Sequence, residues 1–269
     1  MMTDMHTHSV SSHDSVCEIR DMRQAQAARG MAAFAVTDHF DTCSYGDYDV
    51  FTPIRRAYET VCRLNEEGSP CRALMGIEIG ESFREPAVYE RVRNLVPYDA
   101  VIGSVHLVEF GGKLEAYSRT DFSAFSVGEI YEYLDRYFDD LLTMIGFLDF
   151  DILAHLTCPL RYITGKYGFS VDLTRFDGKI RRILEEIIHR GIALEVNTSC
   201  VGTMGELMPP ANIIKAYRDM GGRLVTLGSD AHRAEDAAAC FEEALKVLRD
   251  NGFDTLCGYE NRQAVLIPI

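Results

Sequence analysis

Six of the eight histidines in the chain stand at the polar ends of short apolar segments: His6, His8, His39, His106, His155 and His232. His13 lies in the loop after the first of these segments. His189 differs, because it lies within the helical pattern LEEIIHRG, and we interpret it as a residue on a helix surface. Carboxylates also occur at the segment ends, namely Glu78, Glu81 and Asp230. This joint pattern of imidazoles and carboxylates predicts a shared metal site.

The ligand types narrow the choice of metal. Imidazoles and carboxylates without a cysteine suit Zn²⁺, Fe²⁺ or Mn²⁺, and they argue against a structural zinc bound by thiolates. A single catalytic zinc takes three protein ligands and keeps one open position. The sequence offers enough candidates for two or three ions, with Glu78 as a bridge. The candidate ligands are His6, His8, His13, His39, Glu78, His106, His155, Asp230 and His232.

Seven apolar segments must position these residues. They cover residues 2–8, 31–39, 71–81, 98–106, 147–155, 191–199 and 222–232. Most are rich in Val, Ile, Leu and Ala with little alternation, which is typical of parallel strands covered on both faces. Amphipathic helical patterns lie between them, and the pattern that precedes Gly191 shows a glycine at a helix end. The chain therefore alternates strand and helix about seven times.

This alternation predicts an α/β fold, with a parallel barrel inside a ring of helices and a single domain over residues 1–269. No glycine-rich phosphate loop follows the first segment, which disfavours an open doubly wound sheet. The carboxyl ends of barrel strands converge on one face, so residues that are distant in the sequence meet there. His6 and His8 are two positions apart on an extended strand and point to the same side.

Composition excludes several classes of protein. The formal net charge of −14 disfavours a protein that binds nucleic-acid phosphates. No apolar run approaches the length of about 20 residues that spans a bilayer. The start of the chain lacks a basic segment followed by an apolar one, so we expect no secretory signal. The eight cysteines are scattered without a CxxC pair, which favours reduced thiols and a cytoplasmic location.

Eight short motifs occur in a fixed order along essentially the whole chain: HTH, SHD, TDH, GIE, GSVH, DILAH, EVNTS and GSDAH. Together they resemble the polymerase and histidinol phosphatase (PHP) superfamily. The length and the EVNTS and GSDAH motifs look most like stand-alone histidinol-phosphate phosphatases of the PHP type. The resemblance implies a distorted, TIM-like (β/α)7 barrel with a three-metal site. It also implies hydrolysis of L-histidinol phosphate to L-histidinol and phosphate in histidine biosynthesis.

The same resemblance implies three groups of ligands. His6, His8 and Asp230 would hold one metal, and Glu78 would bridge it to a second metal held by His106 and His155. His13, His39 and His232 would hold a third. We expect a hydroxide that bridges two metals to attack phosphorus. Asp230 and His232 are the candidate catalytic residues, because a protonated Asp or His near the third metal could donate to the leaving oxygen.

The phosphate site departs from the family pattern. Similar enzymes carry a basic residue soon after NTS, whereas this chain reads NTSCVG and has Cys200 there, which we interpret as a spectator thiol. Arg161 follows the fifth-segment histidine, and its planar guanidinium suits two phosphate oxygens. Weaker candidates for the same role are Lys166, Arg84, Arg119 and Arg233.

Three acidic residues stand near the predicted ligands. Asp4 and Asp38 could each orient an imidazole by accepting a hydrogen bond from its N–H, or could simply be turn residues. Glu81 is three positions from Glu78 and is expected to be nearby but secondary.

Two other functions stay open. The chain could be a PHP phosphoesterase that acts on another small phosphate, a nucleotide or nucleic-acid ends, although the acidic charge speaks against long nucleic acids. It could instead be a metal-dependent scaffold without catalysis. All nine ligand positions are filled, which argues against that second reading. We therefore expect a small phosphate ester as the partner, and neither nucleic acid nor membrane.

Overall fold

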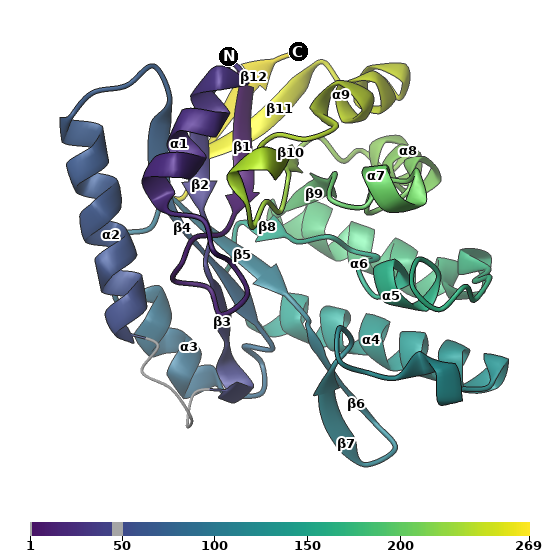
Figure 1. The fold of residues 1–269 in the computed structure, drawn as a ribbon. Helices are drawn as coiled ribbons and strands as arrows, with labels where there is room; N and C mark the ends of the chain where they lie inside the picture. The colour runs from purple at the N-terminus through teal and green to yellow at the C-terminus, as the bar shows by residue number, and fades with distance from the viewer. Residues whose placement is uncertain (1, 45–50) are drawn as a thin grey trace.

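Seven parallel strands form a nearly closed barrel in the computed structural model, which describes residues 2–44 and 51–269. The strands are neighbours in the order in which they occur in the chain (Figure 1). They are β1 (Met2–Thr7), β2 (Met31–Val36), β4 (Arg72–Gly80), β5 (Ala100–Ser104), β8 (Ile152–Leu153), β9 (Ala193–Asn197) and β10 (Val225–Gly228). The predicted distorted (β/α)7 barrel is confirmed, and each of its strands falls within one of the seven predicted segments.

Main-chain hydrogen bonds join the first strand to the segment after the last one. The N–H of Asp230 donates to the carbonyl of His6 at 2.8 Å, and the N–H of His8 donates to that of Ala231 at 2.9 Å. Thr7 and Ala231 form a parallel bridge between these two bonds. The two ends of the sheet thus meet at the carboxyl ends of the strands, where the candidate ligands lie.

A short additional strand extends the sheet at the same end. β3 (His39–Asp41) pairs in parallel with the last residues of β4, with His39 opposite Glu78. Because β3 follows β2 almost directly, it carries the histidine of the TDH motif across to the carboxylate of the GIE motif. Two predicted ligands from different segments are therefore placed in register by main-chain pairing.

Helices surround the barrel on its outer side (Figure 1). The longer ones are α1 (Ile19–Ala28), α2 (Phe51–Glu66), α3 (Pro86–Arg93), α4 (Val127–Phe147), α6 (Asp177–Arg190), α8 (Ala211–Asp219) and α9 (Phe241–Asp250). Short helical turns are α5 (Leu160–Ile163), α7 (Val201–Met204), η1 (Thr42–Ser44), η2 (Phe122–Ala124), η3 (Leu173–Phe176) and η4 (Ala234–Asp236). α6 ends as predicted at Gly191, whose φ of 69° is left-handed. No helix among the described residues is both long and apolar enough to cross a bilayer.

Alternation along the strands separates two apolar regions. On β4, Ile77 and Ile79 pack in the large core beneath the helices, whereas Leu74 packs inside the barrel. Glu78 lies four positions after Leu74 and shares its inward face. The barrel interior is apolar at its amino end, where Cys257 and Tyr259 pack against it. Glu78 and the other candidate ligands lie at the opposite, carboxyl end.

Two antiparallel hairpins lie outside the barrel path. β6 (Leu107–Phe110) and β7 (Lys113–Ala116) follow β5 directly and project from the carboxyl end of the barrel (Figure 1). β11 (Thr255–Glu260) and β12 (Gln263–Pro268) supply the residues that pack against the amino end. The first hairpin therefore borders the predicted site, and the second covers the opposite end.

Candidate metal centre

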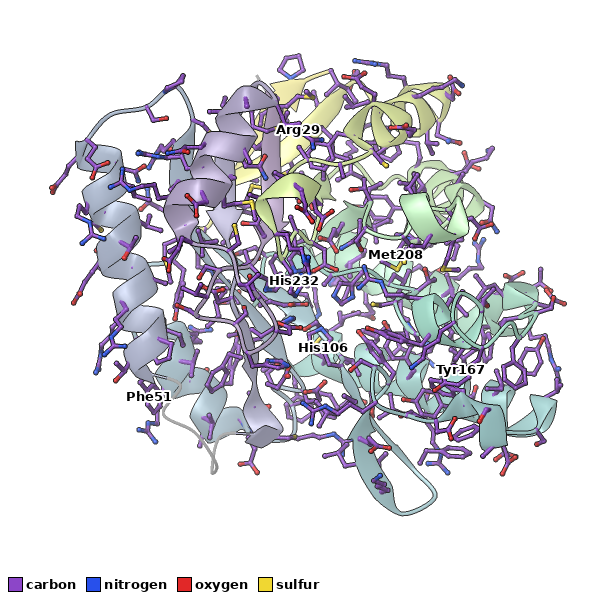
Figure 2. All side chains as sticks on the ribbon, in the orientation of Figure 1. Arg29, Phe51, His106, Tyr167, Met208 and His232 are labelled. Carbon is purple, nitrogen blue, oxygen red and sulfur yellow. The ribbon has the colours of Figure 1, made fainter. Side chains whose placement is uncertain are left out.

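Eight of the nine predicted ligands converge at the carboxyl ends of the strands. The described residues that could hold an ion form overlapping groups, in which the ligand atoms lie within 4.8 Å of one another. His6 comes from β1 and His8 follows this strand directly, while Glu78 comes from β4 and His39 from β3. The segments after β5, β8 and β10 supply the others, which are His106, His155, Asp230 and His232. Figure 2 labels His106 and His232 close to each other near the middle of the molecule.

Glu78 lies at the centre of this cluster and is fully buried. Its Oε1 lies 2.9 Å from Nε2 of His155 and 3.1 Å from Nε2 of His106. Its Oε2 lies 2.7 Å from Nδ1 of His39 and 3.3 Å from Nε2 of His6. Each carboxylate oxygen therefore faces its own pair of imidazoles, which is the arrangement that a bridging ligand requires.

His6, His8 and Asp230 form the first group of the sequence analysis. The Nε2 atoms of the two histidines are 3.1 Å apart, and Oδ1 of Asp230 lies 3.2 Å from Nε2 of His8. Asp230 has a left-handed φ of 54°, a conformation that costs a non-glycine residue free energy. The backbone strain occurs where the chain turns after β10 to bring this carboxylate beside β1.

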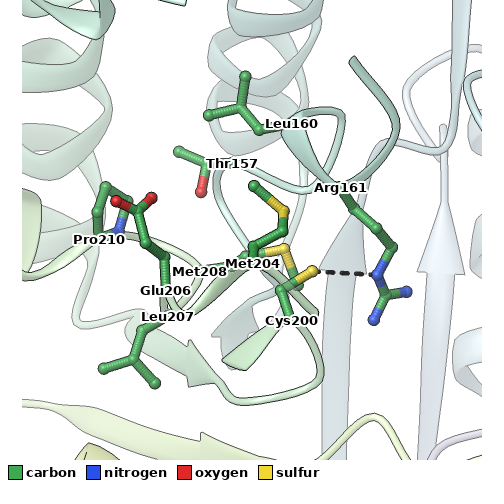
Figure 3. A pocket seen from close by; sticks show the side chains of 9 residues that line it. All are labelled: Thr157, Leu160, Arg161, Cys200, Met204, Glu206, Leu207, Met208 and Pro210. Carbon is green, nitrogen blue, oxygen red and sulfur yellow. Dashed lines mark hydrogen bonds between the residues drawn. The ribbon is translucent and has the colours of Figure 1, made fainter. Parts of the chain in front are cut away.

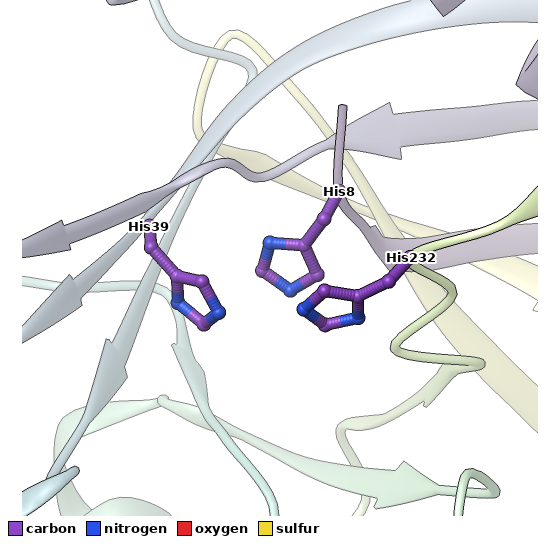
Figure 4. Close-up of side chains that lie close together, drawn as sticks. All are labelled: His8, His39 and His232. Atoms are coloured by element: carbon purple, nitrogen blue, oxygen red, sulfur yellow. The ribbon is translucent and has the colours of Figure 1, made fainter. Parts of the chain in front are cut away.

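Two members of the third expected group, His39 and His232, lie together, with ring centroids 5.7 Å apart. The rings of His39 and His232 each stack on His8, with centroids 4.1 Å away (Figure 4). The carboxylate of Asp14 lies beside both, 3.3 Å from Nε2 of His232 and 3.6 Å from Nε2 of His39. His13 is exposed and belongs to none of the groups of possible ligands among the described residues. The SHD motif contains both residues; Asp14 is also exposed and belongs to none of these groups, and the ring centroid of His13 lies 5.5 Å from that of His39.

The donor atoms of the cluster fit divalent metal ions. Oε2 of Glu78 and Nδ1 of His39 are buried, and neither has a hydrogen-bond partner although they are only 2.7 Å apart. Nδ1 of His155 is likewise buried without a partner. Leaving buried polar atoms unpaired costs free energy, and imidazoles with carboxylates are ligands for zinc, iron and manganese. The cation would supply the missing partner to these atoms.

The electrostatics of the cluster couple metal and proton binding. Burial alone would lower the pKa of His39, but the charge of Glu78 outweighs it and raises this pKa to about 10. Burial would raise the pKa of Glu78, yet the charges of the surrounding imidazoles, led by His106, hold it well below its usual range. A metal ion that binds to these residues must therefore displace protons.

Arg161 lies beside the first group of ligands. Its Nη2 donates to Oγ of Ser199 and lies 3.5 Å from Oδ2 of Asp230. Its Nε donates to the thiol of Cys200 at 3.2 Å (Figure 3). Cys200 is fully buried, consistent with its interpretation as a spectator thiol. Among the weaker candidates, Arg84 and Arg233 pair with carboxylates outside the ligand set, namely Asp140 and Glu235.

The two aspartates that precede ligands do not contact imidazoles directly. Asp4 accepts hydrogen bonds from the N–H and Oγ of Ser229 and from the amide of Gln26. Asp38 accepts from the N–H and Oγ of Ser9 and from Oγ of Ser12. The suggestion that they orient an imidazole directly is therefore wrong, because their carboxylate oxygens accept hydrogen bonds from main-chain N–H and hydroxyl groups instead.

Glu81 is buried at the edge of the cluster, where it forms a group of possible ligands with Asp41 and His106. It accepts the main-chain N–H groups of His106 and Leu107. Burial, and then the charge of Asp41, raise the pKa of Glu81 to about 8. This residue therefore shapes the turn after β5.

Sequence reasoning overlooked two acids that contact imidazoles of the cluster, the buried Glu195 and the half-buried Asp41. A signal for Glu195 was present, because a lone carboxylate inside the apolar segment GIALEVN needs a buried partner. Asp41 follows the TDH motif by two residues and carried no comparable signal.

Comparison with known proteins agrees with the geometry. Residues 4–199 match the model of the PHP domain, which covers well over half of the chain, and the protein therefore belongs to the PHP domain family. The match ends before Asp230 and His232, which the structure places in the same cluster.

Relatives of similar length carry phosphatase names. A histidinol-phosphatase of Lactococcus lactis is 26% identical over 260 residues, which are 95% of this chain and 93% of the relative. A probable histidinol-phosphatase of Thermotoga maritima is 27% identical over 264 residues, which are 95% of this chain and 94% of the relative. The crystal structure of the Lactococcus lactis histidinol phosphate phosphatase with zinc, L-histidinol and phosphate has the same fold. Its TM-score is 0.82 at 23% identity, with 98% of both chains covered.

Proposed function

We propose that this protein is a metal-dependent phosphomonoesterase that hydrolyses L-histidinol phosphate to L-histidinol and phosphate, in histidine biosynthesis. The observation that carries the proposal is the convergence of six imidazoles and the two carboxylates of Glu78 and Asp230, with the guanidinium of Arg161 beside Asp230. The full-length relatives named as histidinol-phosphatases support this choice of substrate. The eight free cysteines favour a cytoplasmic location for the single-domain enzyme.

Two or three divalent ions, zinc, iron or manganese, would bind to this cluster. His6, His8 and Asp230 would hold one, and Glu78, His106 and His155 a second. For a third ion we propose Asp14 with His39 and His232, in place of His13, because the carboxylate of Asp14 lies beside both imidazoles. Bound divalent ions supply a water of lowered pKa and offset negative charge on the phosphoryl oxygens.

The residues of the chain itself would orient the ester. Arg161 is positioned to bind two phosphate oxygens through its planar guanidinium, and Ser199 and Cys200 hold it from one side. In an enzyme with two ions, where His232 is not a ligand, this quarter-exposed imidazole with Asp14 at its Nε2 would deliver a proton to the leaving alkoxide. Asp230 contacts His8 and approaches Arg161, and thus links the metal and phosphate parts of the site.

A panel of phosphate esters tests this function. The protein, loaded in turn with Zn²⁺, Mn²⁺ or Fe²⁺, is assayed with L-histidinol phosphate, nucleoside monophosphates and a generic aryl phosphate. We expect the highest kcat/KM with L-histidinol phosphate. A preference for a nucleotide by about an order of magnitude would refute the substrate assignment, and binding of less than about one ion per chain would refute metal catalysis.

A different small phosphate ester is the second candidate. It is favoured by the buried thiol of Cys200, which occupies the region where similar enzymes carry a basic residue. Arg161 is then left as the guanidinium at the ligand cluster. The same panel separates the two candidates, because an enzyme for another small ester would hydrolyse the aryl phosphate at least as well as L-histidinol phosphate.

A further inference from the structure

Two carboxylates outside the predicted ligand set, the buried Glu195 and the half-buried Asp41, contact imidazoles of the cluster. Nδ1 of His6 lies 2.6 Å from Oε1 of Glu195, and the other nitrogen of the same ring, Nε2, faces Glu78 at 3.3 Å. Glu195 is 1% exposed and comes from β9, on the far side of β10 from β1. One ring nitrogen of His6 is thus taken up by a carboxylate, and the other is directed to the metal cluster.

His106 repeats this arrangement at the opposite side of Glu78. Nδ1 of His106 lies 2.9 Å from Oδ1 of Asp41, and Nε2 lies 3.1 Å from Oε1 of Glu78. His6 faces the other oxygen, Oε2. The two pairs therefore flank the central carboxylate, one at each of its oxygens.

Each of the two carboxylates is packed against a glycine at the end of a strand. A Cβ at Gly228 would collide with Oε1 of Glu195 and with Cβ of His6. A Cβ at Gly80 would collide with Oδ1 of Asp41. Neither glycine has a left-handed φ, so these positions require glycine for space and not for backbone conformation. The strand ends leave room for these carboxylate–imidazole pairs in particular.

Glu195 also connects two ligands from different strands. Its Oε2 accepts the main-chain N–H of His155 at 2.6 Å and the side-chain amide of Asn197 at 3.3 Å. Its other oxygen accepts from His6. Both oxygens of the carboxylate are occupied by donors, which an amide in their place could not fully satisfy.

We propose that Glu195 and Asp41 are positioning residues, which fix His6 and His106 as the tautomers protonated at Nδ1 and so present Nε2 to the metal ions. A neutral imidazole has one donor and one acceptor nitrogen, and a carboxylate at Nδ1 decides which is which. The negative charge also makes the free nitrogen a stronger ligand. The inference rests on the proposed metal-dependent function and names how two of its ligands are held.

Zinc affinity tests the proposal without any assay of activity. Zn²⁺ binding to metal-free protein is measured by competition with a chromophoric chelator, for the wild type and for Glu195→Gln, Asp41→Asn and Asp41→Ala. We expect about 10- to 100-fold weaker binding of at least one ion in each variant. Asp41→Asn should fall between the wild type and Asp41→Ala, because asparagine keeps an acceptor at Nδ1 but not the charge.

Asp151→Asn is the matched control. Asp151 accepts the N–H of Val101 and pairs with Arg262 at the amino end of the barrel, away from the ligands. It should unfold at a lower temperature yet bind Zn²⁺ like the wild type. Equal zinc affinity in Glu195→Gln, Asp41→Asn and the control would overturn the proposal.

Nitrogen chemical shifts of the imidazoles give a test that needs no variant. In the zinc-loaded wild type, His6 and His106 should each carry the proton on Nδ1, and protonation of Nε2 in either would overturn the proposal. If the wild type binds zinc and hydrolyses esters, and the variants bind zinc as tightly as the wild type, only this inference is refuted. A protein that shows both Nδ1 tautomers and hydrolyses no ester defeats only the proposed function.

Discussion

The metal-facing and phosphate-facing sides of the barrel mouth are held in different ways. Around Glu78, the imidazoles of His6 and His106 are buried or nearly so and fixed by a second carboxylate at their far nitrogen. Arg161, in contrast, is 29% exposed on its side chain and rests on a hydroxyl and a thiol. The metal side is therefore rigid, and the phosphate side can change with the substrate at a smaller cost to the fold.

The largest effect should follow from removal of the bridging carboxylate charge. Glu78→Gln loses the charge that faces imidazoles through both oxygens, so we expect fewer bound ions and kcat/KM lower by about 10³-fold or more. Metal analysis by mass spectrometry and steady-state kinetics check this. A variant with the full metal content and near-normal activity would show that the metal side is less interdependent than proposed.

A smaller effect is expected on the phosphate side. Arg161→Ala should lower kcat/KM by about 10²-fold, because a charged bidentate contact to phosphate is lost, while the metal content stays unchanged. Arg161→Lys should recover part of this loss, since the charge returns without the planar fork. If Arg161→Ala released metal ions, the guanidinium would belong functionally to the metal side through Asp230.

Two adjacent loop residues give a matched pair at the boundary between the sides. Asp14→Ala should weaken binding of one ion by about 10- to 100-fold, because this carboxylate lies beside His39 and His232. His13→Ala should leave the metal content unchanged, since His13 makes only a ring contact with His39, at 5.5 Å between centroids, whereas Asp14 forms ion pairs with both imidazoles. Titration with zinc separates them, and loss of an ion in His13→Ala alone would restore the ligand set implied by the family resemblance.

The smallest effect concerns pH. The pKa of His39 is raised to about 10, so the metal-free protein holds this proton at pH 7 and must release it to bind a metal. Zinc affinity should therefore rise with pH through neutrality and fall, by up to about tenfold per pH unit and released proton, as the pH is lowered. Calorimetry in buffers of different ionisation enthalpy measures the protons released. Release of none would contradict the prediction.

The sequence predicted the parts of the site that lie on strands. The apolar segments located the seven strands, and the carboxyl ends of parallel strands must meet, so His6, Glu78 and His155 could be brought together without a structure. The choice between His13 and Asp14 could not be made in this way. The two are exposed neighbours in a loop, and the apolar pattern of the strands does not specify which of them approaches His39 and His232.

The apolar pattern of the sequence also could not show which acidic side chains contact the imidazoles. Asp4 and Asp38 stand beside ligands in the sequence, yet their oxygens are used by main-chain and hydroxyl groups. Asp41 reaches its imidazole from β3, 65 positions away in the chain. Side-chain direction depends on register between strands, and apolar periodicity does not specify that register.

The bridge between Thr7 and Ala231 also means that the barrel cannot close until nearly the whole chain has been synthesised. At roughly 5–20 residues per second, the ribosome needs about 10–45 s to proceed from His6 to His232. Throughout this interval β1 has no neighbour on one of its edges, and unpaired strand edges promote aggregation. The ion that His6, His8 and Asp230 would hold can therefore be loaded only after the last barrel strand has emerged.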